Sequence, residues 1–254
     1  MRRVLILGGT AEARALAAEL AADPGMRVVS SLAGRVTDPR LPAGQVRMGG
    51  FGGPDGLTAW LAAERIDAMV DATHPFAARM TASAAEAAAR TGVPLLILRR
   101  PGWREGPGDD WQRVASLAEA ATRLHGMARQ HGPARVFLTT GRRSLPVFTG
   151  LAGVWLLARS VDPPEPPVPD NVHVLLDRGP YTVAGERALI REHRLDVLVT
   201  KDSGGRMTTA KLVAARELGL PVIMVDRPPL PIGVRTVETV GAAVTWLHKR
   251  RDHG

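Results

Sequence analysis

The chain of 254 residues is 45% hydrophobic and 23% charged, which is typical of a soluble globular protein with one large or two small domains. It has no cysteine, which excludes disulfide bonds and thiolate metal sites and favours the reducing cytoplasm, and no apolar stretch approaches the roughly 18 residues of a membrane span. The net charge of +8 is spread over scattered arginines with only 4% aromatic residues, which argues against nucleic-acid binding and fits a small polyanionic substrate. We therefore expect a cytoplasmic protein with no membrane or nucleic-acid partner.

Apolar runs alternate with segments of helical spacing through the first hundred residues. Strands are predicted at 3–8, 27–31, 45–48, 68–72 and 94–98, and helices at 11–22, 55–65 and 76–91. Strands that alternate with helices predict a parallel sheet covered on both faces. The turn-rich sequence PGWREGPGDD at 101–110 interrupts the pattern and marks the end of a first domain, 1–101.

The alternation of strands and helices resumes after this break. Helices are predicted at 115–130, 181–193 and 207–218, and strands at 135–140, 154–158, 172–176, 196–200 and 221–226. The proline-rich run at 163–170 predicts a stiff, extended connection at the surface. These elements define a second domain, 102–233, and the remaining 234–254 are predicted to form a tail with a short strand and a last helix.

Two segments of the chain align with each other without a gap. RMTASAAEAAARTGVPLLILRRP at 79–101 and RMTTAKLVAARELGLPVIMVDRP at 206–228 share Arg-Met-Thr, a Gly-x-Pro before the strand and a closing Arg-Pro. We interpret this as an internal duplication, which predicts two Rossmann-like α/β lobes with parallel sheets and a cleft between them. The loops expected to face that cleft are those at Gly8, Thr73, Gly141 and Lys201.

The first predicted strand ends at a pair of glycines and turns directly into a helix. Compared with the dinucleotide-binding pattern G-x-G-x-x-G/A, the second glycine is replaced by Thr10. Thr10 either offers its hydroxyl to a phosphate or moves the cofactor outward, and the alternative is a tight turn that merely needs small residues. The candidate cofactor-binding residues of this turn are Gly8, Gly9, Thr10, Ala11 and Glu12.

A second indication of the cofactor comes from the position at which an NAD enzyme places an acidic residue on the adenosine ribose. The sequence there is SSLAGR, which offers the hydroxyls of Ser30 and Ser31 and the cation of Arg35 but no acid. These groups suit a 2′-phosphate, so NADPH is favoured over NADH. The alternative is that Arg35 lies on a solvated loop.

Four motifs occur in a specific order and spacing. They are LGGTAEARALA at 7–17, DATHPFA at 71–77, RGPY at 178–181 followed by Glu186, and VTKDSGG at 199–205 followed by Lys211. Together they resemble the precorrin-6A reductase (precorrin-6x reductase) family of cobalamin biosynthesis, and the likeness covers nearly the whole chain. The resemblance implies an NADPH-dependent reduction of one double bond of precorrin-6A, with hydride at C19 and a proton at C18, to give precorrin-6B. A tetrapyrrole with many carboxylates would also suit the positive charge.

The resemblance and the predicted topology assign roles to the loops of the first lobe. Thr73 and His74 follow a strand and are expected near the nicotinamide end of the cofactor. His74 is a candidate catalytic residue that would give a proton or hold a carboxylate, and the alternative is that it caps the next helix. Three carboxylates, Asp71, Glu12 and Asp202, lie near the loops, and the sequence does not separate a proton donor from a structural acceptor among them.

In the second lobe, the KDSGG loop combines backbone donors with an ammonium group, which suits anion capture. Lys201 is the second candidate catalytic residue, because it would polarise a reacting imine or bind a substrate carboxylate; a surface pair with Asp202 is the alternative. The candidate substrate-binding residues are Gly141, Arg142, Arg143, Lys201, Asp202, Ser203, Gly204 and Gly205. No metal site is expected.

Two other functions stay open at this point. One is another NADP-dependent α/β reductase of a small acidic substrate, and the other is a non-catalytic polyanion-binding protein. A simple two-substrate dehydrogenase would not need the KDSGG loop, whereas a polyanion binder would lose affinity steeply with salt. The sequence does not indicate the oligomeric state.

Overall fold

The computed structural model describes residues 1–34 and 41–249, which form two compact α/β units. The first unit consists of Met1–Pro101 with Pro228–Gly254, and the second consists of Gly102–Arg227. Each unit contains a six-stranded parallel sheet, which confirms the predicted fold class. Within the described ranges, no helix is both long and apolar enough to cross a membrane.

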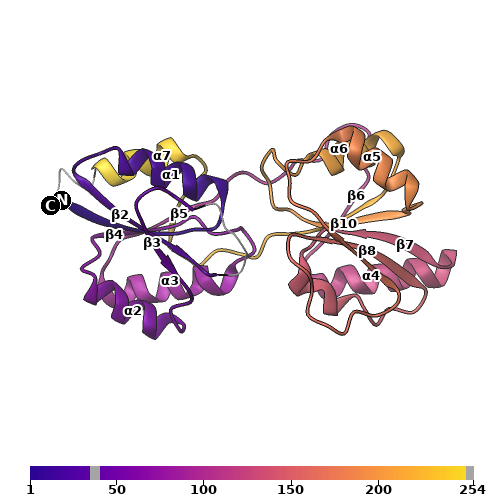
Figure 1. The fold of residues 1–254 in the computed structure, drawn as a ribbon, viewed down its shortest axis with the longest axis horizontal. Helices are drawn as coiled ribbons and strands as arrows, with labels where there is room; N and C mark the ends of the chain where they lie inside the picture. The colour runs from indigo at the N-terminus through magenta and orange to yellow at the C-terminus, as the bar shows by residue number, and fades with distance from the viewer. Residues whose placement is uncertain (35–40, 250–254) are drawn as a thin grey trace. The chain divides into compact units, whose positions relative to one another are not determined.

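The sheet of the first unit has the strand order β12-β5-β4-β1-β2-β3. Its strands are β1 (Arg2–Leu7), β2 (Met26–Leu32), β3 (Gln45–Met48), β4 (Ala68–Asp71), β5 (Leu95–Leu98) and β12 (Arg235–Val237). Helices α1 (Ala11–Ala21) and α7 (Val240–Lys249) cover one face, and α2 (Pro54–Ala63) and α3 (Ala78–Thr91) cover the other (Figure 1).

The central strand β1 is buried on both faces of this sheet. Val4 and Ile6 belong to the buried cluster formed with α1 and α7. Leu5 and Leu7 point the other way and belong to the cluster formed with α2 and α3. Because both faces are covered, the strand reads as the uninterrupted apolar run VLIL rather than as an alternating pattern.

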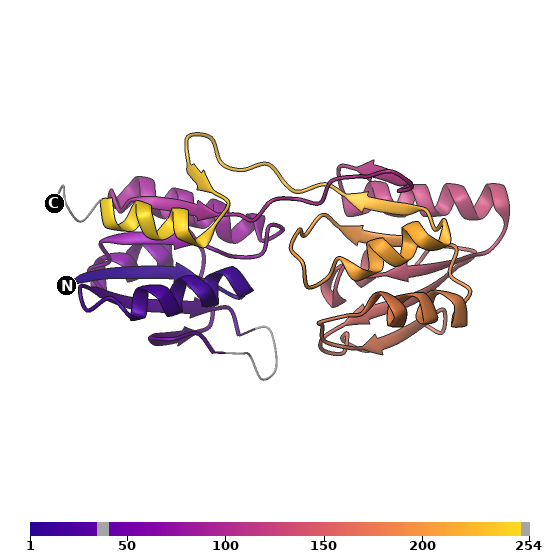
Figure 2. The ribbon, with the colours of Figure 1, turned by 90° about the horizontal axis from the view of Figure 1, so that it is seen from above.

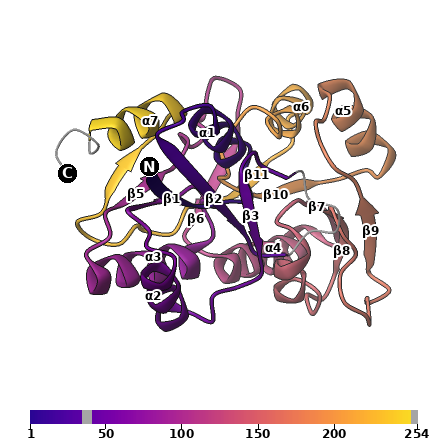
Figure 3. The ribbon, with the colours of Figure 1, turned by 60° about the vertical axis from the view of Figure 1, so that its left-hand side comes forward.

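The sheet of the second unit has the strand order β6-β11-β10-β7-β8-β9. Its strands are β6 (Trp111–Val114), β7 (Ala134–Leu138), β8 (Val154–Ser160), β9 (Val172–Leu176), β10 (Val197–Lys201) and β11 (Val222–Val225). Its helices are α4 (Leu117–His131), the short 3₁₀ helix η1 (Arg142–Val147), α5 (Val183–Glu192) and α6 (Ala210–Leu218). Helices α5 and α6 lie side by side on one face, where Leu212 packs on Phe137 and Leu198 of the sheet, and α4 covers the other face (Figures 1 and 3).

The two units repeat one plan, which confirms the predicted duplication. Strands β7 to β11 occupy the positions in the second sheet that β1 to β5 occupy in the first. The two aligned sequence segments form α3 with β5 and α6 with β11, and each helix ends at a left-handed glycine, Gly92 or Gly219. Glycine adopts this conformation without the steric penalty of a Cβ atom, so the same turn directs both helices back to their sheets.

A second repeated feature fixes the beginning of the central strand. In the first unit the Asp67 carboxylate accepts a hydrogen bond of 2.7 Å from the backbone N–H of Arg3. In the second unit Asp196 accepts a bond of the same length from the backbone N–H of Arg135. These aspartates serve the fold, because they lie at the edge of the sheet opposite to the loops that carry the four motifs.

The edge strand of each sheet comes from outside the repeat and corrects two predictions. No strand was predicted at 111–114, because β6 is a short edge strand with apolar residues only at its two ends. The predicted tail 234–254 is not a separate part: β12 pairs with β5, and α7 buries Trp246 in the first core (Figure 2). The second unit accordingly ends at Arg227 rather than at residue 233.

Candidate functional site

Each sheet has one point at which its strand order reverses, and the loops at that point are the candidate site of the unit. In the first unit the reversal lies between β1 and β4, and in the second it lies between β7 and β10. In open α/β sheets, ligands bind at the carboxyl ends of the strands beside such a point. The loops concerned are 8–10 and 72–77 in the first unit and 139–142 and 201–205 in the second.

The glycine turn of the first unit has the geometry of an anion cradle, but the Thr10 hydroxyl is already engaged. Gly9 has φ of 109°, and a Cβ atom there would meet no atom within 4 Å, so the turn is open on its outer side. Thr10 caps α1 by accepting from the Ala13 N–H at 3.1 Å, and it donates to the Ala72 carbonyl at 2.8 Å. Because its one proton is used inside the fold, the donors left for a phosphate are backbone N–H groups at the start of α1.

Glu12, in the first turn of α1, is paired with a cation of the same unit. Its carboxylate lies 2.8 Å from the Arg100 guanidinium, and both side chains are mostly buried. Arg100 belongs to the Arg-Pro that closes the first repeated segment. The pair neutralises Glu12, so its carboxylate does not oppose an anion at the turn.

The end of β2 offers less to a cofactor than predicted. Ser30 is buried, and its hydroxyl has no hydrogen-bond partner among the described residues. Ser30 is therefore enclosed within the unit, and its role as a ribose contact stays a prediction. Ser31, one position further, accepts a weak bond of 3.4 Å from Arg47. Arg35 lies outside the described residues.

Arg47 is a candidate binding residue that the sequence did not reveal. It lies on β3 beside Ser31, donates to the carbonyls of Gly49 and Gly50 at 2.6 and 2.8 Å, and stacks 3.9 Å from the ring centroid of Phe51. These contacts hold the guanidinium at the carboxyl end of the sheet, next to the end of β2. In so arginine-rich a chain, only the glycine-rich sequence that follows it, MGGFGG, marks this arginine as different.

The loop after β4 is organised by the buried carboxylate of Asp71. One of its oxygens accepts from the backbone N–H and the hydroxyl of Thr73 at 3.0 and 2.7 Å, and the other accepts from the Thr81 hydroxyl at 2.6 Å. Asp71 is thus a structural acceptor. The Thr73 hydroxyl donates its proton to Asp71, so a cofactor can meet it only as an acceptor.

His74 is exposed at the tip of the same loop. Its Nδ1 atom accepts from the Phe76 N–H at 3.3 Å, which places the proton of the neutral ring on Nε2. Helix α3 begins later, after Ala77, whose N–H is bonded to the His74 carbonyl at 2.7 Å. The N-cap of α3 is Ala77 and no side chain caps the helix, so His74 shapes the turn before the helix rather than the start of the helix itself.

At the corresponding point of the second unit, Lys201 joins the two loops. Its Nζ atom donates to the Thr140 carbonyl at 2.8 Å, and burial lowers the pKa of Lys201 below its ordinary value. The Lys201 side chain is half-buried. After Thr140, Gly141 has φ of 87° and repeats the turn at Gly9. The helix that would follow is not an α-helix, because Pro146 lies within it, and the chain forms η1 instead.

The two arginines of this turn differ in their surroundings. Arg142 is half-buried and donates to the Pro163 carbonyl at 3.1 Å, whereas Arg143 is exposed. Both lie at the carboxyl edge of the sheet, as predicted. Their charges add to that of Lys201 at this edge.

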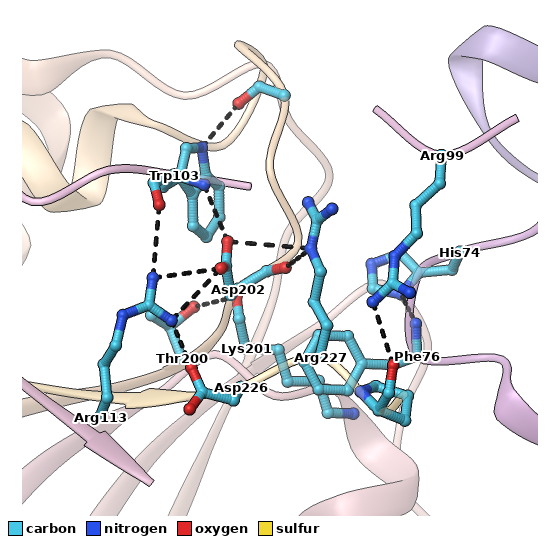
Figure 4. Close-up of polar contacts among 12 residues, drawn as sticks. His74, Phe76, Arg99, Trp103, Arg113, Thr200, Lys201, Asp202, Asp226 and Arg227 are labelled. Carbon is cyan, nitrogen blue, oxygen red and sulfur yellow. Dashed lines mark hydrogen bonds and ion pairs between the residues drawn. The ribbon is translucent and has the colours of Figure 1, made fainter. Parts of the chain in front are cut away.

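Asp202 has a structural role that replaces its predicted contact with substrate (Figure 4). Its buried carboxylate accepts from the backbone N–H of Trp103 at 2.9 Å and from Arg113 at 3.2 Å, and it lies 4.0 Å from the Arg227 guanidinium. Arg227 also donates to the Asp202 carbonyl at 2.7 Å. Both oxygens of the Asp202 carboxylate are thus engaged by donors of the same unit.

The remaining residues of the KDSGG loop are held by backbone geometry. The Ser203 N–H bonds to the Lys201 carbonyl at 2.6 Å, and Gly204 and Gly205 have φ of 64° and 82°. The Gly205 carbonyl accepts from the Trp103 indole at 3.0 Å. The loop is thus anchored on one side by Trp103, while its glycines allow a backbone path that other residues rarely adopt.

A buried charged cluster beneath these loops was not predicted. Arg159 of β8 and Glu186 of α5 form a bidentate ion pair at 2.5 and 3.2 Å, and Tyr181 covers Arg159 at 3.7 Å from its ring centroid. Lys211 of α6 is 5% exposed, and burial, with a smaller effect of Arg159, lowers the pKa of Lys211 to about 7. Sequence motifs contain Tyr181, Glu186 and Lys211, but do not show that these residues meet.

Comparisons with known proteins identify the family of this chain. The chain matches the family described as Precorrin-6x reductase CbiJ/CobK over residues 3–248. It belongs to this family. It is 56% identical to the precorrin-6A reductase of Rhodococcus erythropolis over 247 residues, covering 97% of this chain and 98% of the relative. The same shares are covered at 50% identity, over 248 residues, by the precorrin-6A reductase of Mycobacterium tuberculosis.

The solved structure of the CobK precorrin-6A reductase is similar to this fold. The TM-score is 0.89 at 43% sequence identity, with 100% of this chain and 98% of that chain covered. The resemblance that the four motifs suggested is therefore confirmed for the family and for the fold. Within this member of the precorrin-6x reductase family, the first two motifs lie in the first unit and the last two in the second.

The structural role of Asp202 gives a stability prediction. Asp202→Ala should lower the free energy of unfolding by about 2 to 4 kcal/mol, because it removes the acceptor that Arg113 and the Trp103 N–H share in a buried position. Asp226→Ala is the matched control: it removes the other carboxylate bonded to Arg113 at a site that is 44% exposed, and should cost less than about 1 kcal/mol. Urea denaturation of both variants measures the difference. Equal losses would contradict the role assigned to Asp202.

Proposed function

We propose that this chain is a precorrin-6A reductase that uses NADPH to form precorrin-6B, with the cofactor on the first unit and the tetrapyrrole on the second. The observation that carries this proposal is the near full-length match to relatives that bear the name precorrin-6A reductase. Bound NADPH supplies the hydride, which reaches C19 of the substrate while C18 takes a proton. The residues of the chain bind, orient and protonate.

The first unit fits a dinucleotide phosphate. The open turn at Gly9 and the start of α1 offer backbone donors, and Glu12 is already neutralised by Arg100. Among the residues that the structure describes, no acidic side chain lies at the end of β2, where Ser31 and Arg47 meet instead. A cation fixed at that place favours the 2′-phosphate of NADPH, so we assign the discrimination between the cofactors to Arg47; Arg35, which the sequence predicts for this contact, lies outside the described residues and stays a prediction.

Protonation of the substrate is assigned to the loop after β4. The Thr73 hydroxyl is held by Asp71, whereas the exposed His74 ring carries its proton on Nε2, away from its bond to the Phe76 N–H. Of the two, only the His74 imidazole can take up a second proton and act as an acid near neutral pH, whereas its neutral form presents Nε2–H as a hydrogen-bond donor to a substrate carboxylate. The Asp71 carboxylate keeps the loop that carries His74 in place.

Binding of the tetrapyrrole carboxylates is assigned to the carboxyl edge of the second sheet. Lys201, Arg142 and Arg143 supply positive charge there, and Ser203, Gly204 and Gly205 supply backbone and hydroxyl groups. Lys201 is fixed by its bond to the Thr140 carbonyl, which orients the ammonium. Asp202 is left out of this set, because its carboxylate accepts hydrogen bonds from the Trp103 N–H and Arg113 and so holds the loop in place.

The proposed activity is tested by incubating the protein with precorrin-6A and either NADPH or NADH while recording the absorbance of the reduced nicotinamide. We expect one NADPH to be consumed for each precorrin-6A, with kcat/KM for NADH lower by at least about tenfold, since a lost charge-assisted contact costs about 1.5 to 3 kcal/mol. If the protein binds NADPH but precorrin-6A causes no oxidation of it, the proposed reaction is contradicted. Equal kcat/KM values for both cofactors would contradict the assignment of NADPH alone.

The role of Arg47 is tested by comparing Arg47→Ala with Arg35→Ala. Arg47→Ala should raise the KM for NADPH by about 10- to 150-fold and leave that for NADH almost unchanged, because only NADPH carries the 2′-phosphate. Arg35→Ala tests the residue that the sequence predicts for the same contact: a rise in the KM for NADPH alone in that variant would assign the 2′-phosphate to Arg35. Arg47→Lys should recover part of the loss, since it keeps the charge without the planar fork. If Arg47→Ala weakens both cofactors equally, Arg47 only supports the loop at Gly49 and Gly50.

Lys201 is tested by substitutions that separate substrate from cofactor. Lys201→Ala should lower turnover or raise the KM for precorrin-6A, while the affinity for NADPH stays within about twofold, because Lys201 belongs to the second unit. Lys201→Arg should restore activity only in part, since a guanidinium spreads its charge over a plane. Full activity of the alanine variant would remove Lys201 from the site and shift substrate binding to Arg142 and Arg143.

A further inference from the structure

The buried cluster of Arg159, Glu186 and Lys211 contains one more cation than it has carboxylates. Glu186 is committed to Arg159 through both of its oxygens. Within the described ranges Lys211 forms no ion pair, and the charge of Glu186 is the weakest of the effects on its pKa, although burying a charge is costly. The aromatic ring of Trp103, whose centroid is 5.1 Å from Nζ, is the neighbour that compensates it.

Trp103 is also the residue that anchors both ends of the 202–205 segment. Its backbone N–H donates to the Asp202 carboxylate at 2.9 Å, and its indole N–H donates to the Gly205 carbonyl at 3.0 Å. Thr209 adds a bond of 2.8 Å to the same carbonyl. Any movement of the Trp103 ring would therefore be transmitted to a loop whose two glycines have left-handed conformations.

We propose that Lys211 is a positioning residue: its ammonium holds the ring of Trp103, and Trp103 in turn holds the 202–205 loop in the conformation that receives the substrate. The role of the loop in receiving the substrate rests on the proposed function. The effect of Lys211 on Trp103 and of Trp103 on the loop does not. A cation attracts the face of an indole ring, and the attraction is strongest where water is excluded. Lys211 thus acts on the loop through Trp103, from inside the unit, and not through a contact with the substrate.

The charge of Lys211 also makes this fastening depend on pH. The charged and titratable groups around it are Arg159 of β8, Glu186 of α5 and Tyr181 before α5, with Asp202 and Arg113 on the far side of Trp103. Burial raises the pKa of Tyr181, away from neutrality, whereas the pKa of Lys211 is lowered to about 7. Lys211 is charged below this pH, so the contact with Trp103 is present there and is lost as the pH rises.

The first experiment needs no substrate and follows the fluorescence of Trp103, taken as the difference between the wild-type protein and Trp103→Phe. We expect this difference to titrate between about pH 6 and about pH 8.5, with a midpoint near the Lys211 pKa of about 7. In Lys211→Met it should be flat, and in Lys201→Met it should titrate as in the wild type. A flat difference signal, obtained with a Trp103→Phe variant whose circular dichroism shows that it is folded, overturns the proposal.

The second experiment measures the KM for precorrin-6A in a double-mutant cycle. Lys211→Met should raise this KM by about fivefold below pH 7 and abolish its rise with pH, with the KM for NADPH within about twofold. Trp103→Leu removes this contact and also the indole bond to the Gly205 carbonyl, so it should raise the KM at least as much, and the double variant should be no worse than Trp103→Leu alone. Additive effects would overturn the coupling through Trp103. A normal fluorescence titration with an unchanged KM would instead overturn the assignment of the loop to the substrate, and with it that part of the proposed function.

Discussion

One hydrogen bond across the point of strand reversal organises each of the two sheets. In the first unit it runs from the Thr10 hydroxyl to the Ala72 carbonyl, and in the second from the Lys201 ammonium to the Thr140 carbonyl. Both bonds tie together the two loops that flank the reversal, so the geometry of each candidate site depends on them. The donor is a neutral hydroxyl in the first unit and an ammonium group in the second, so only the second bond places a positive charge at the carboxyl edge of its sheet.

This difference explains how a duplicated fold acquires two unlike edges. The repeat preserves the parts that build the sheet, such as the aspartates that bond the start of the central strand and the glycines that end α3 and α6. It diverges in the loops. A hydroxyl that is consumed internally leaves backbone donors for a diphosphate, whereas an ammonium, with the arginines beside it, provides full charges for carboxylates.

The sequence predicted what depends on local patterns and failed where distant residues meet. Uninterrupted apolar runs such as VLIL located the central strands, and the repeated Gly-x-Pro located the duplication, because each signal is contained in a few neighbouring residues. The partner of β12 was not predictable, since hydrophobicity does not specify which sheet a strand joins. The family and the fold were recognised from the motifs, whereas the cofactor and the individual roles of His74 and Lys201 stay predictions.

The same limit applies to the candidate site. Thr10 and Asp202 were assigned to ligands. The carbonyl that accepts from Thr10 lies 62 positions away in the chain, and the Trp103 N–H that donates to Asp202 lies 99 positions away. Ser30 was assigned to the ribose although it is 1% exposed, on a strand of a sheet whose two faces are both covered. Arg47 escaped notice because one arginine among many carries little information until its stacking on Phe51 is seen.

The origin of the edge strands also sets the order in which the units can be completed during synthesis. The second unit is one continuous stretch, Gly102–Arg227, so all its strands have emerged before the ribosome reaches β12. The first unit begins earlier but lacks β12 and α7 until the end, which leaves apolar side chains of α1 and β5 uncovered in the meantime. The part of the chain made first is therefore finished last, and the nascent protein carries an exposed apolar face that a chaperone would recognise until α7 docks.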